Sequence, residues 1–326
     1  MDCSRILLLA LLLACCAPVR AKAEIERVSI GGHTYLRARD WAKANGLEPA
    51  WVTREKSMQL ANGSTRIVIA MDSRESTFNG IRFVLSRPVV YRNEAVYVSQ
   101  LDATTIFAPL LNPPRQTAGK KIKTICLDPG HGGRDPGNQA AGRSEKKYTL
   151  LLAEELQRQL TKLGFKVVLT RKGDSTLDLD GRPVAAKKLG ADVFVSLHFN
   201  GTPTSKNTVR GAETYCLTPA GASSTNAGGA GAGSGSHRGN ANDDENVCLA
   251  FQIQRALVKT LSAEDRGVRR ARFAVLRDAA MPAVLVEAGF MSHPTEGRKI
   301  ADAAYRKQMA RAIADGIVAY KKSVEN

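Results

Sequence analysis

Apolar residues in the first third of the chain alternate with polar ones in short runs, the pattern of half-buried strands. The clearest runs are residues 28–30, 33–36 and 95–99. A helical segment at residues 37–45 ends at Gly46, and turn pairs at residues 79–80 and 92–93 indicate hairpins. Residues 24–112 therefore predict a small α+β module, which we interpret as a targeting or spacer module.

The pattern changes after a linker-like stretch at residues 113–119. The predicted strands are residues 122–127, 166–170, 193–197, 212–217, 273–276 and 283–286. The predicted helices are residues 145–163, 182–189 and 246–261, with a long terminal helix at 297–320. This alternation predicts an α/β fold over residues 120–322, with a mainly parallel twisted sheet flanked by helices. Residues 220–242 are rich in Gly, Ala and Ser, so we expect a flexible insert there.

The first residues have the pattern of an export signal. Arg5 supplies a positive start, residues 6–14 are apolar, and residues 21–23 offer a small-x-small cleavage site. An apolar run of this length is too short to span a bilayer. We therefore expect a signal peptide at residues 1–23 and an exported protein of the periplasm or cell envelope. The alternative is a lipoprotein anchored through Cys15.

Composition and charge narrow the class of partner. Hydrophobic residues make up 43% of the chain and charged residues 24%, which is typical of a packed protein rather than a disordered one. The formal charge is +16, which fits either plain solubility or attraction to an anionic wall polymer or a membrane surface. Because exported proteins rarely meet nucleic acid, we predict no nucleic-acid partner.

The cysteines indicate neither a disulfide framework nor a metal site. Three of them, Cys126, Cys216 and Cys248, follow the predicted signal peptide, and an odd number cannot all pair. None has the C-x-x-C spacing of a metal or redox site. We interpret them as small buried apolar residues.

Three ionisable residues stand immediately after apolar, strand-like runs: His131, His198 and Glu287. The carboxyl ends of parallel strands meet at one edge of a sheet, where α/β proteins bind ligands, so the three side chains should converge on one cleft. Glu145 begins the predicted helix that follows His131, close enough in sequence to reach the same cleft.

Two imidazoles and one carboxylate form a common catalytic zinc set that leaves one position open to water. We assign these roles to His131, Glu145 and His198, with one Zn²⁺ ion as the expected cofactor. Such an ion lowers the pKa of bound water towards about 7 and polarises a carbonyl. Glu287 would then pass a proton to the leaving amine. Singly, His131 also fits a turn residue and Glu145 a helix N-terminal charge, so the hypothesis depends on all four together.

Seven short motifs surround these residues. They are LDPGHGG at 127–133, EK at 145–146, LTR at 169–171, VSLHFN at 195–200, RGV at 266–268, VLR at 275–277 and MPAVLVEAGF at 281–290. In this order they resemble the zinc-dependent N-acetylmuramoyl-L-alanine amidases of the amidase 3 type. The resemblance covers nearly all of residues 120–320 and implies the same roles: zinc on the His131, Glu145 and His198 side chains, and Glu287 as catalytic acid/base. We further predict that Asn200 and Arg182 contact substrate.

The resemblance implies an enzyme that hydrolyses the amide between N-acetylmuramic acid and L-alanine in peptidoglycan, and we expect the protein to be a monomer. Two alternatives remain: another zinc hydrolase of wall peptides, and a catalytically inactive peptidoglycan-binding or regulatory protein. Some relatives carry an autoinhibitory helix that an activator displaces, but residues 220–242 contain too much glycine to form one, and an activator stays unknown. Residues 24–112 separately resemble the N-terminal domains of copper amine oxidases.

Overall fold

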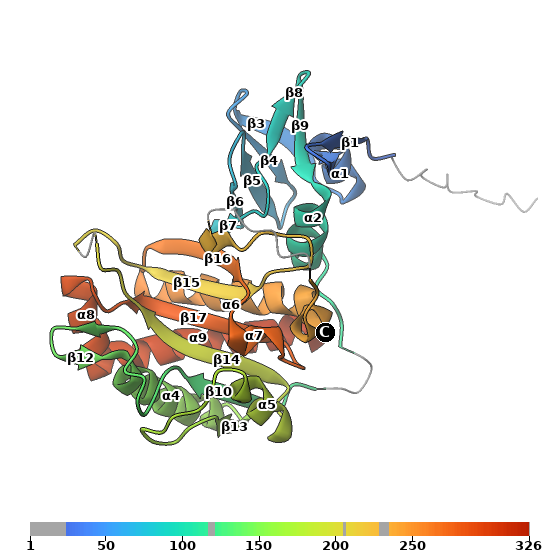
Figure 1. Cartoon of the computed structure of the whole chain (residues 1–326). Helices are drawn as coiled ribbons and strands as arrows, with labels where there is room; N and C mark the ends of the chain where they lie inside the picture. Colours follow the sequence, from blue (N-terminus) through green and yellow to red (C-terminus); the bar gives the residue numbers. More distant parts are fainter. Residues whose placement is uncertain (1–23, 117–120, 205–206, 228–234, 326) are drawn as a thin grey trace, which may run out of the picture.

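The computed structural model describes four stretches of the chain: residues 24–116, 121–204, 207–227 and 235–325 (Figure 1). The predicted signal peptide and the alternative anchor at Cys15 lie outside the described residues. The first stretch is rich in strands, as its alternating pattern predicts. Its elements are β1 (Arg27–Ile30), β2 (His33–Arg37), α1 (Ala38–Ala44), β3 (Glu48–Thr53), β4 (Ser57–Ala61), β5 (Arg66–Ala70), β6 (Glu75–Phe78), β7 (Ile81–Val84), β8 (Val90–Arg92), β9 (Ala95–Ser99), α2 (Gln100–Asp102), η1 (Ala103–Phe107) and α3 (Ala108–Leu111).

Strands and helices alternate in the remainder of the chain. The elements are β10 (Thr124–Pro129), β11 (Gln139–Ala140), β12 (Arg143–Ser144), α4 (Glu145–Lys162), β13 (Lys166–Leu169), α5 (Gly181–Lys188), β14 (Val193–Asn200), β15 (Ala212–Leu217), η2 (Thr225–Ala227), η3 (Arg238–Asn242), α6 (Asp243–Leu261), β16 (Asp265–Ala271), α7 (Ala274–Arg277), β17 (Ala283–Phe290), α8 (Pro294–Ala301) and α9 (Ala303–Glu325).

One continuous sheet runs through both parts of the molecule. Its strand order is β13-β10-β14-β17-β15-β16-β7-β6-β5-β4-β3. The strands β13, β10, β14 and β17 are parallel neighbours, whereas β15 runs antiparallel to β17. Strands β10, β14 and β17 are buried almost throughout, which explains their unbroken apolar runs. The predicted fold class, a mainly parallel sheet flanked by helices and preceded by a small module, is confirmed.

Helices cover both faces of the central strands (Figure 1). Helix α9 packs against α4 and α6 on one face, while α5 and α7 contact each other on the opposite face. Successive residues of a strand point to opposite faces, so Leu127 joins the core under α4 and Cys126 joins the core under α5 and α7. The three described cysteines are free and buried, as predicted.

The N-terminal module is joined to the second part through this sheet. Strand β7 pairs in parallel with β16 through Phe83 and Val268, and the Arg82 backbone N–H donates to Asp265 Oδ2 at 2.8 Å. On the face of the sheet, the ring of Phe251 in α6 stacks on Phe83 with centroids 6.1 Å apart. The interface therefore combines backbone pairing with aromatic packing, neither of which the sequence pattern predicted.

Two predicted elements are wrong. Residues 273–276 form most of helix α7 rather than a strand, because a short apolar run does not distinguish the two. The strand lies earlier, at β16, where arginine side chains interrupt the apolar pattern. The predicted terminal helix at 297–320 is instead two helices, α8 and α9, because the backbone is extended at Asp302.

The described flanks of the Gly-rich insert pack onto the protein. Ala222 is fully buried, and the Thr225 hydroxyl donates to the Arg270 carbonyl and accepts from the Arg270 N–H. Residues 228–234 lie outside the described part. The insert is thus anchored to β16 on its N-terminal side.

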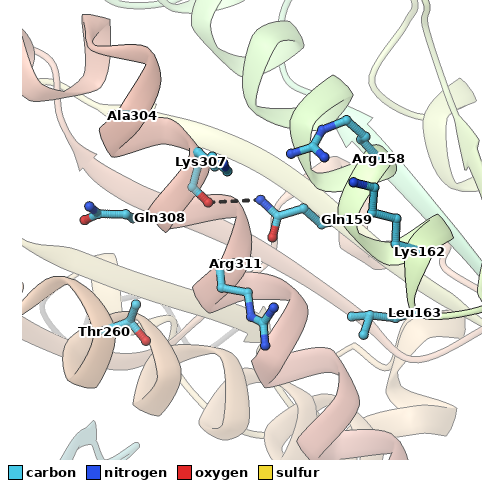
Figure 2. A pocket seen from close by; sticks show the side chains of 9 residues that line it. All are labelled: Arg158, Gln159, Lys162, Leu163, Thr260, Ala304, Lys307, Gln308 and Arg311. Carbon is cyan, nitrogen blue, oxygen red and sulfur yellow. Dashed lines mark hydrogen bonds between the residues drawn. The ribbon is translucent and has the colours of Figure 1, made fainter.

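An open groove of about 610 Å³ lies between α4 and α9 (Figure 2). Its basic side chains are Arg158, Lys162, Lys307 and Arg311. Arg158 pairs with Glu155 and Arg311 with Asp315, both on the same helix as their partner. No His, Cys or acidic residue is among the described residues that line it, so this basic groove offers a cationic surface without a catalytic group.

Candidate metal centre

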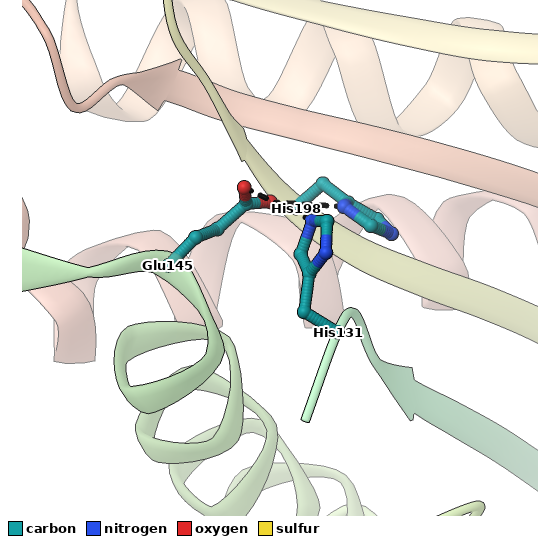
Figure 3. A group of neighbouring side chains, drawn as sticks. All are labelled: His131, Glu145 and His198. Carbon is teal, nitrogen blue, oxygen red and sulfur yellow. Dashed lines mark hydrogen bonds and ion pairs between the residues drawn. The ribbon is translucent and has the colours of Figure 1, made fainter. Parts of the chain in front are cut away.

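The three residues predicted as zinc ligands come together at the carboxyl ends of the central strands (Figure 3). Each offers one donor atom, and these atoms all lie within 4.8 Å of one another. His131 Nε2 is 3.0 Å from Glu145 Oε2, and His198 Nδ1 is 2.9 Å from Glu145 Oε1. Two imidazoles and one carboxylate at this spacing could hold a metal ion.

The loop after β10 presents His131. Its backbone has φ of 61°, a left-handed conformation that is uncommon for a residue with a side chain. Asp135 Oδ2 lies 2.7 Å from His131 Nδ1 and accepts its hydrogen, which leaves Nε2 facing Glu145. Arg182 Nη2 donates to the His131 carbonyl at 2.9 Å and so holds the loop. The loop thus fixes both the backbone and the ring of His131.

Two glycines make room for the imidazole rings. A Cβ added to Gly130 would lie 2.3 Å from the His198 ring, and one added to Gly137 would lie 2.6 Å from the His131 ring. Carbon atoms do not approach so closely in a packed interior, so any larger residue would displace the rings. These glycines are therefore required by the ligand positions.

Glu145 is the first residue of α4 and is only 1% exposed. Its carboxylate accepts hydrogen bonds from the Asn138 N–H, from Asn138 Nδ2 and from the Phe199 N–H, at 2.8 to 3.0 Å. Burial raises the pKa of Glu145, but the hydrogen bonds and charges of His131 and His198 outweigh it and hold the pKa below its usual value. The carboxylate is thus kept ionised, as a metal ligand must be.

Glu287 lies in the same cleft as the three donor residues. The cleft has a volume of about 280 Å³, and Glu287 is next to His198 in the register of β14 and β17. Its Oε2 atom is buried and has no hydrogen-bond partner in the described part of the chain. Burial raises the pKa of Glu287 well above its usual value, and the charges of Glu145 and Glu213 raise it further. A strongly raised carboxyl pKa in a cleft is characteristic of a group that transfers protons.

The two residues predicted to contact substrate are bound within the protein. Arg182 is 2% exposed and donates to Asp128 Oδ1 at 2.8 Å and to the Pro129 carbonyl at 2.9 Å. Asn200 Nδ2 donates to Glu213 Oε1 at 2.8 Å. Neither residue lines the cleft. The geometry makes Arg182 a positioning residue for the His131 loop, and substrate contact by Asn200 stays a prediction.

Several residues of the site were missed by sequence reasoning. Asp135 could have been found from its place four residues after His131 in the same loop, and Asn138 from its place in the loop before Glu145. The apolar wall of the cleft includes Leu179 and Phe273, which come from segments far apart in the sequence. No local signal identifies such a wall, because it exists only after the sheet has formed.

Comparison with known proteins gives two family matches. Residues 125–319 match the family described as N-acetylmuramoyl-L-alanine amidase, and residues 18–107 match the family described as copper amine oxidase N-terminal domain. The first match takes in all four residues of the candidate site. The second agrees with the predicted resemblance of the N-terminal module.

Three curated relatives share about a third of their aligned residues with this chain. The N-acetylmuramoyl-L-alanine amidase LytC of Bacillus subtilis is 34% identical over 198 residues, which are 61% of this chain and 35% of LytC. The N-acetylmuramoyl-L-alanine amidase AmiA of Escherichia coli is 32% identical over 236 residues, covering 63% of this chain and 78% of AmiA. The probable cell wall amidase LytH of Staphylococcus epidermidis is 33% identical over 206 residues, covering 62% of this chain and 60% of LytH. The chain thus spans less than two thirds of the length of LytC and LytH.

Two solved structures of N-acetylmuramoyl-L-alanine amidases are also similar to this chain. The N-acetylmuramoyl-L-alanine amidase from Clostridium difficile 630 superposes with a TM-score of 0.53 and 32% identity, covering 62% of this chain and 97% of that one. The catalytic domain of CwlV, an N-acetylmuramoyl-L-alanine amidase from Bacillus (Paenibacillus) polymyxa, has a TM-score of 0.51 and 30% identity, covering 61% of this chain and 98% of that domain.

Proposed function

The chain belongs to the N-acetylmuramoyl-L-alanine amidase family, and from this premise we propose that it hydrolyses the amide between N-acetylmuramic acid and L-alanine in peptidoglycan. One observation carries the proposal: the three donor residues His131, Glu145 and His198 share a single cleft with the half-buried acid Glu287. Amide hydrolysis needs an activated water, a polarised carbonyl and a proton for the leaving amine, and these groups can supply all three.

The donor set fits one zinc ion, held by His131, Glu145 and His198. Catalytic zinc sites commonly have three nitrogen or oxygen ligands from the protein and one open position. When bound, the ion would lower the pKa of a water molecule and polarise the scissile carbonyl. Asp135 supports the assignment of His131 as a zinc ligand. It holds the proton on Nδ1, which leaves the Nε2 lone pair free to bind the ion.

Glu287 is the acid/base in this proposal. Its raised pKa lets it hold a proton at a pH where an ordinary glutamate has lost it, and its unpaired Oε2 is not committed to another group among the described residues. It takes a proton from the attacking water and delivers it to the amine nitrogen, which must be protonated to leave. Arg182 contributes by holding the His131 backbone rather than by touching substrate.

Digestion of purified peptidoglycan tests the proposal. Release of free stem peptides from intact glycan chains, lost with a chelator and restored by Zn²⁺, is the expected result. Cleavage within the peptide, or release of acetate, would identify another zinc hydrolase. A folded, zinc-loaded protein that releases nothing would instead be a catalytically inactive peptidoglycan-binding or regulatory protein.

We also propose that the protein is exported to the cell envelope, where its substrate lies. The signal-like pattern of residues 1–23 and the name of LytH, a probable cell wall amidase, support this location. Within the described stretches, every helix is too short or too polar to pass through a bilayer. The basic groove between α4 and α9 is the candidate surface for the expected anionic wall polymer or membrane surface (Figure 2).

A further inference from the structure

A second groove, of about 730 Å³, adjoins the catalytic cleft, and Asn138 lines both. Residues of the β11–β12 hairpin line this side groove, together with Met291, Ser292, Pro294 and Arg298 around the start of α8. Asn138 Nδ2 also donates to Glu145 Oε2 at 2.9 Å, so the side groove begins beside a proposed zinc ligand. A substrate chain that passes Asn138 from the reaction centre therefore enters it.

The side groove is cationic. Arg143 and Arg298 line it, and none of its described lining residues is acidic. Arg143 Nε is buried and, within the described structure, has no hydrogen-bond partner. Its Nη2 atom would lie 3.2 Å from a Cβ placed on Gly297, so the guanidinium reaches from β12 across to α8. A buried guanidinium nitrogen without a partner is costly, and an anionic ligand would satisfy it.

Among the described residues, no carboxylate pairs with either arginine. In the same part of the chain, the hydrogen-bond partner of Arg298 Nη2 is the Thr295 hydroxyl, at 3.5 Å. The nearest acid on the same helix, Glu296, accepts hydrogen bonds from the Phe290 and Gly211 N–H groups and does not line the groove. In the basic groove between α4 and α9, by contrast, both lining arginines have carboxylate partners.

We infer that Arg143 and Arg298 bind free carboxylates of the stem peptide and thereby select for them. The inference rests on the proposed function. In that substrate the scissile amide separates a neutral N-acetylated sugar from a peptide whose carboxylates are ionised at neutral pH. Only the peptide side can satisfy two guanidinium groups, which bind carboxylates through paired hydrogen bonds. The peptide thus occupies the side groove, and the sugar faces the apolar wall at Leu179 and Phe273.

The test compares two substrates: uncross-linked glycan strands whose stem peptides carry free carboxylates, and the same strands with those carboxylates amidated. For the zinc-loaded wild type, kcat/KM should favour the free carboxylates by about 10- to 100-fold, as expected for a charged hydrogen bond. Arg298→Gln and Arg143→Gln should each lose most of this preference, and Arg298→Glu should reverse it. Arg158→Gln, in the basic groove, is the matched control and should keep the wild-type ratio.

The outcomes separate this inference from the proposed function. Equal hydrolysis of both substrates by the wild type, or an unchanged ratio in Arg298→Gln, overturns the carboxylate site and leaves the amidase activity standing. Hydrolysis of neither substrate overturns the proposed function and the inference with it. Arg143 is partly buried, so Arg143→Gln could fail to fold; the exposed Arg298 then decides the question alone.

Discussion

Glu213 and Glu287 lie directly opposite each other on the antiparallel strands β15 and β17. Opposite residues of such a pair project from the same face, so the two carboxylates occupy one region of the sheet. Glu213 is neutralised by Arg266 and Arg269 and accepts from the Tyr215 hydroxyl, whereas Glu287 Oε2 has no partner among the residues described. Burial is the largest cause of the raised pKa of Glu287, and the charge of Glu213 adds to it.

Glu213→Gln should move the acid limb of the pH–activity profile to lower pH. A raised carboxyl pKa means that the ionised base is lost at a higher pH than usual, and removing the Glu213 charge lowers the pKa of Glu287 again. Ionised Glu287, which takes the proton from water, then persists to lower pH. Profiles of kcat/KM from about pH 4 to about pH 9 check this, since they report the pKa of the free enzyme.

The matched control for that experiment is Glu264→Gln. Glu264 is a half-exposed acid paired with Arg210, and it does not line the cleft. Its removal should leave the acid limb in place. If the acid limb of the profile does not shift in Glu213→Gln, or shifts to higher pH, then Glu213 does not raise the pKa of Glu287.

Glu287→Gln should retain zinc and lose activity. Glu287 is not one of the three clustered donor residues, so the zinc content should match the wild type. Without its proton transfer, kcat should fall by about 10²- to 10⁴-fold. Metal analysis and digestion of peptidoglycan measure the two effects. Glu145→Gln is the companion variant and should lose zinc as well; wild-type activity in Glu287→Gln would remove Glu287 from the mechanism.

Gly130→Ala should weaken zinc binding without removing a ligand. The added Cβ would lie 2.3 Å from the His198 ring and force it to move, and a misplaced ligand commonly costs about 10- to 100-fold in metal affinity. Competition with a zinc-binding dye measures the change. Gly173→Ala is the control, because a Cβ there meets nothing within 4 Å. Equal affinity in the two variants would mean that the His198 position is not needed for zinc.

The four principal residues of the site were predictable because each carries a local signal. His131 follows β10, and His198 and Glu287 end the apolar runs within β14 and β17; parallel strands place their carboxyl ends at one edge of the sheet. Glu145 is the first residue of the helix after His131, and a first-turn position points back into that edge. The prediction needed only the order of strands, not the detailed packing.

What escaped prediction depends on contacts between distant segments. Arg143 and Arg298 both line the side groove, yet they are far apart in sequence and neither has a distinctive neighbourhood. The pairing of Phe83 with Val268 is of the same kind, since an edge strand shows no sign of the strand that will extend it. Strand β16 was missed for a further reason, because its charged residues hide the alternation that identifies a strand.

Phe251→Ala should uncouple the N-terminal module from the rest of the protein. The Phe251 ring is 4% exposed and contacts Phe78 and Phe83 of the module, with centroids 5.4 Å and 6.1 Å apart. Removing a buried phenylalanine costs about 3 to 5 kcal/mol of unfolding free energy. Part of this lost free energy comes from the interface between the module and the rest of the protein. That interface is what makes the two parts unfold together.

The two tryptophans of the chain, Trp41 and Trp51, both lie in the module, so their fluorescence reports on it alone, while far-UV circular dichroism reports on the whole protein. In the wild type the two denaturation curves should coincide, and in Phe251→Ala the fluorescence transition should come first. Phe165→Ala is the control, since buried Phe165 directly precedes β13, at the end of the sheet opposite the strands of the module; it should lower stability and keep the curves together. Separate transitions in the wild type would mean that the β7–β16 pairing does not couple the module to the catalytic part.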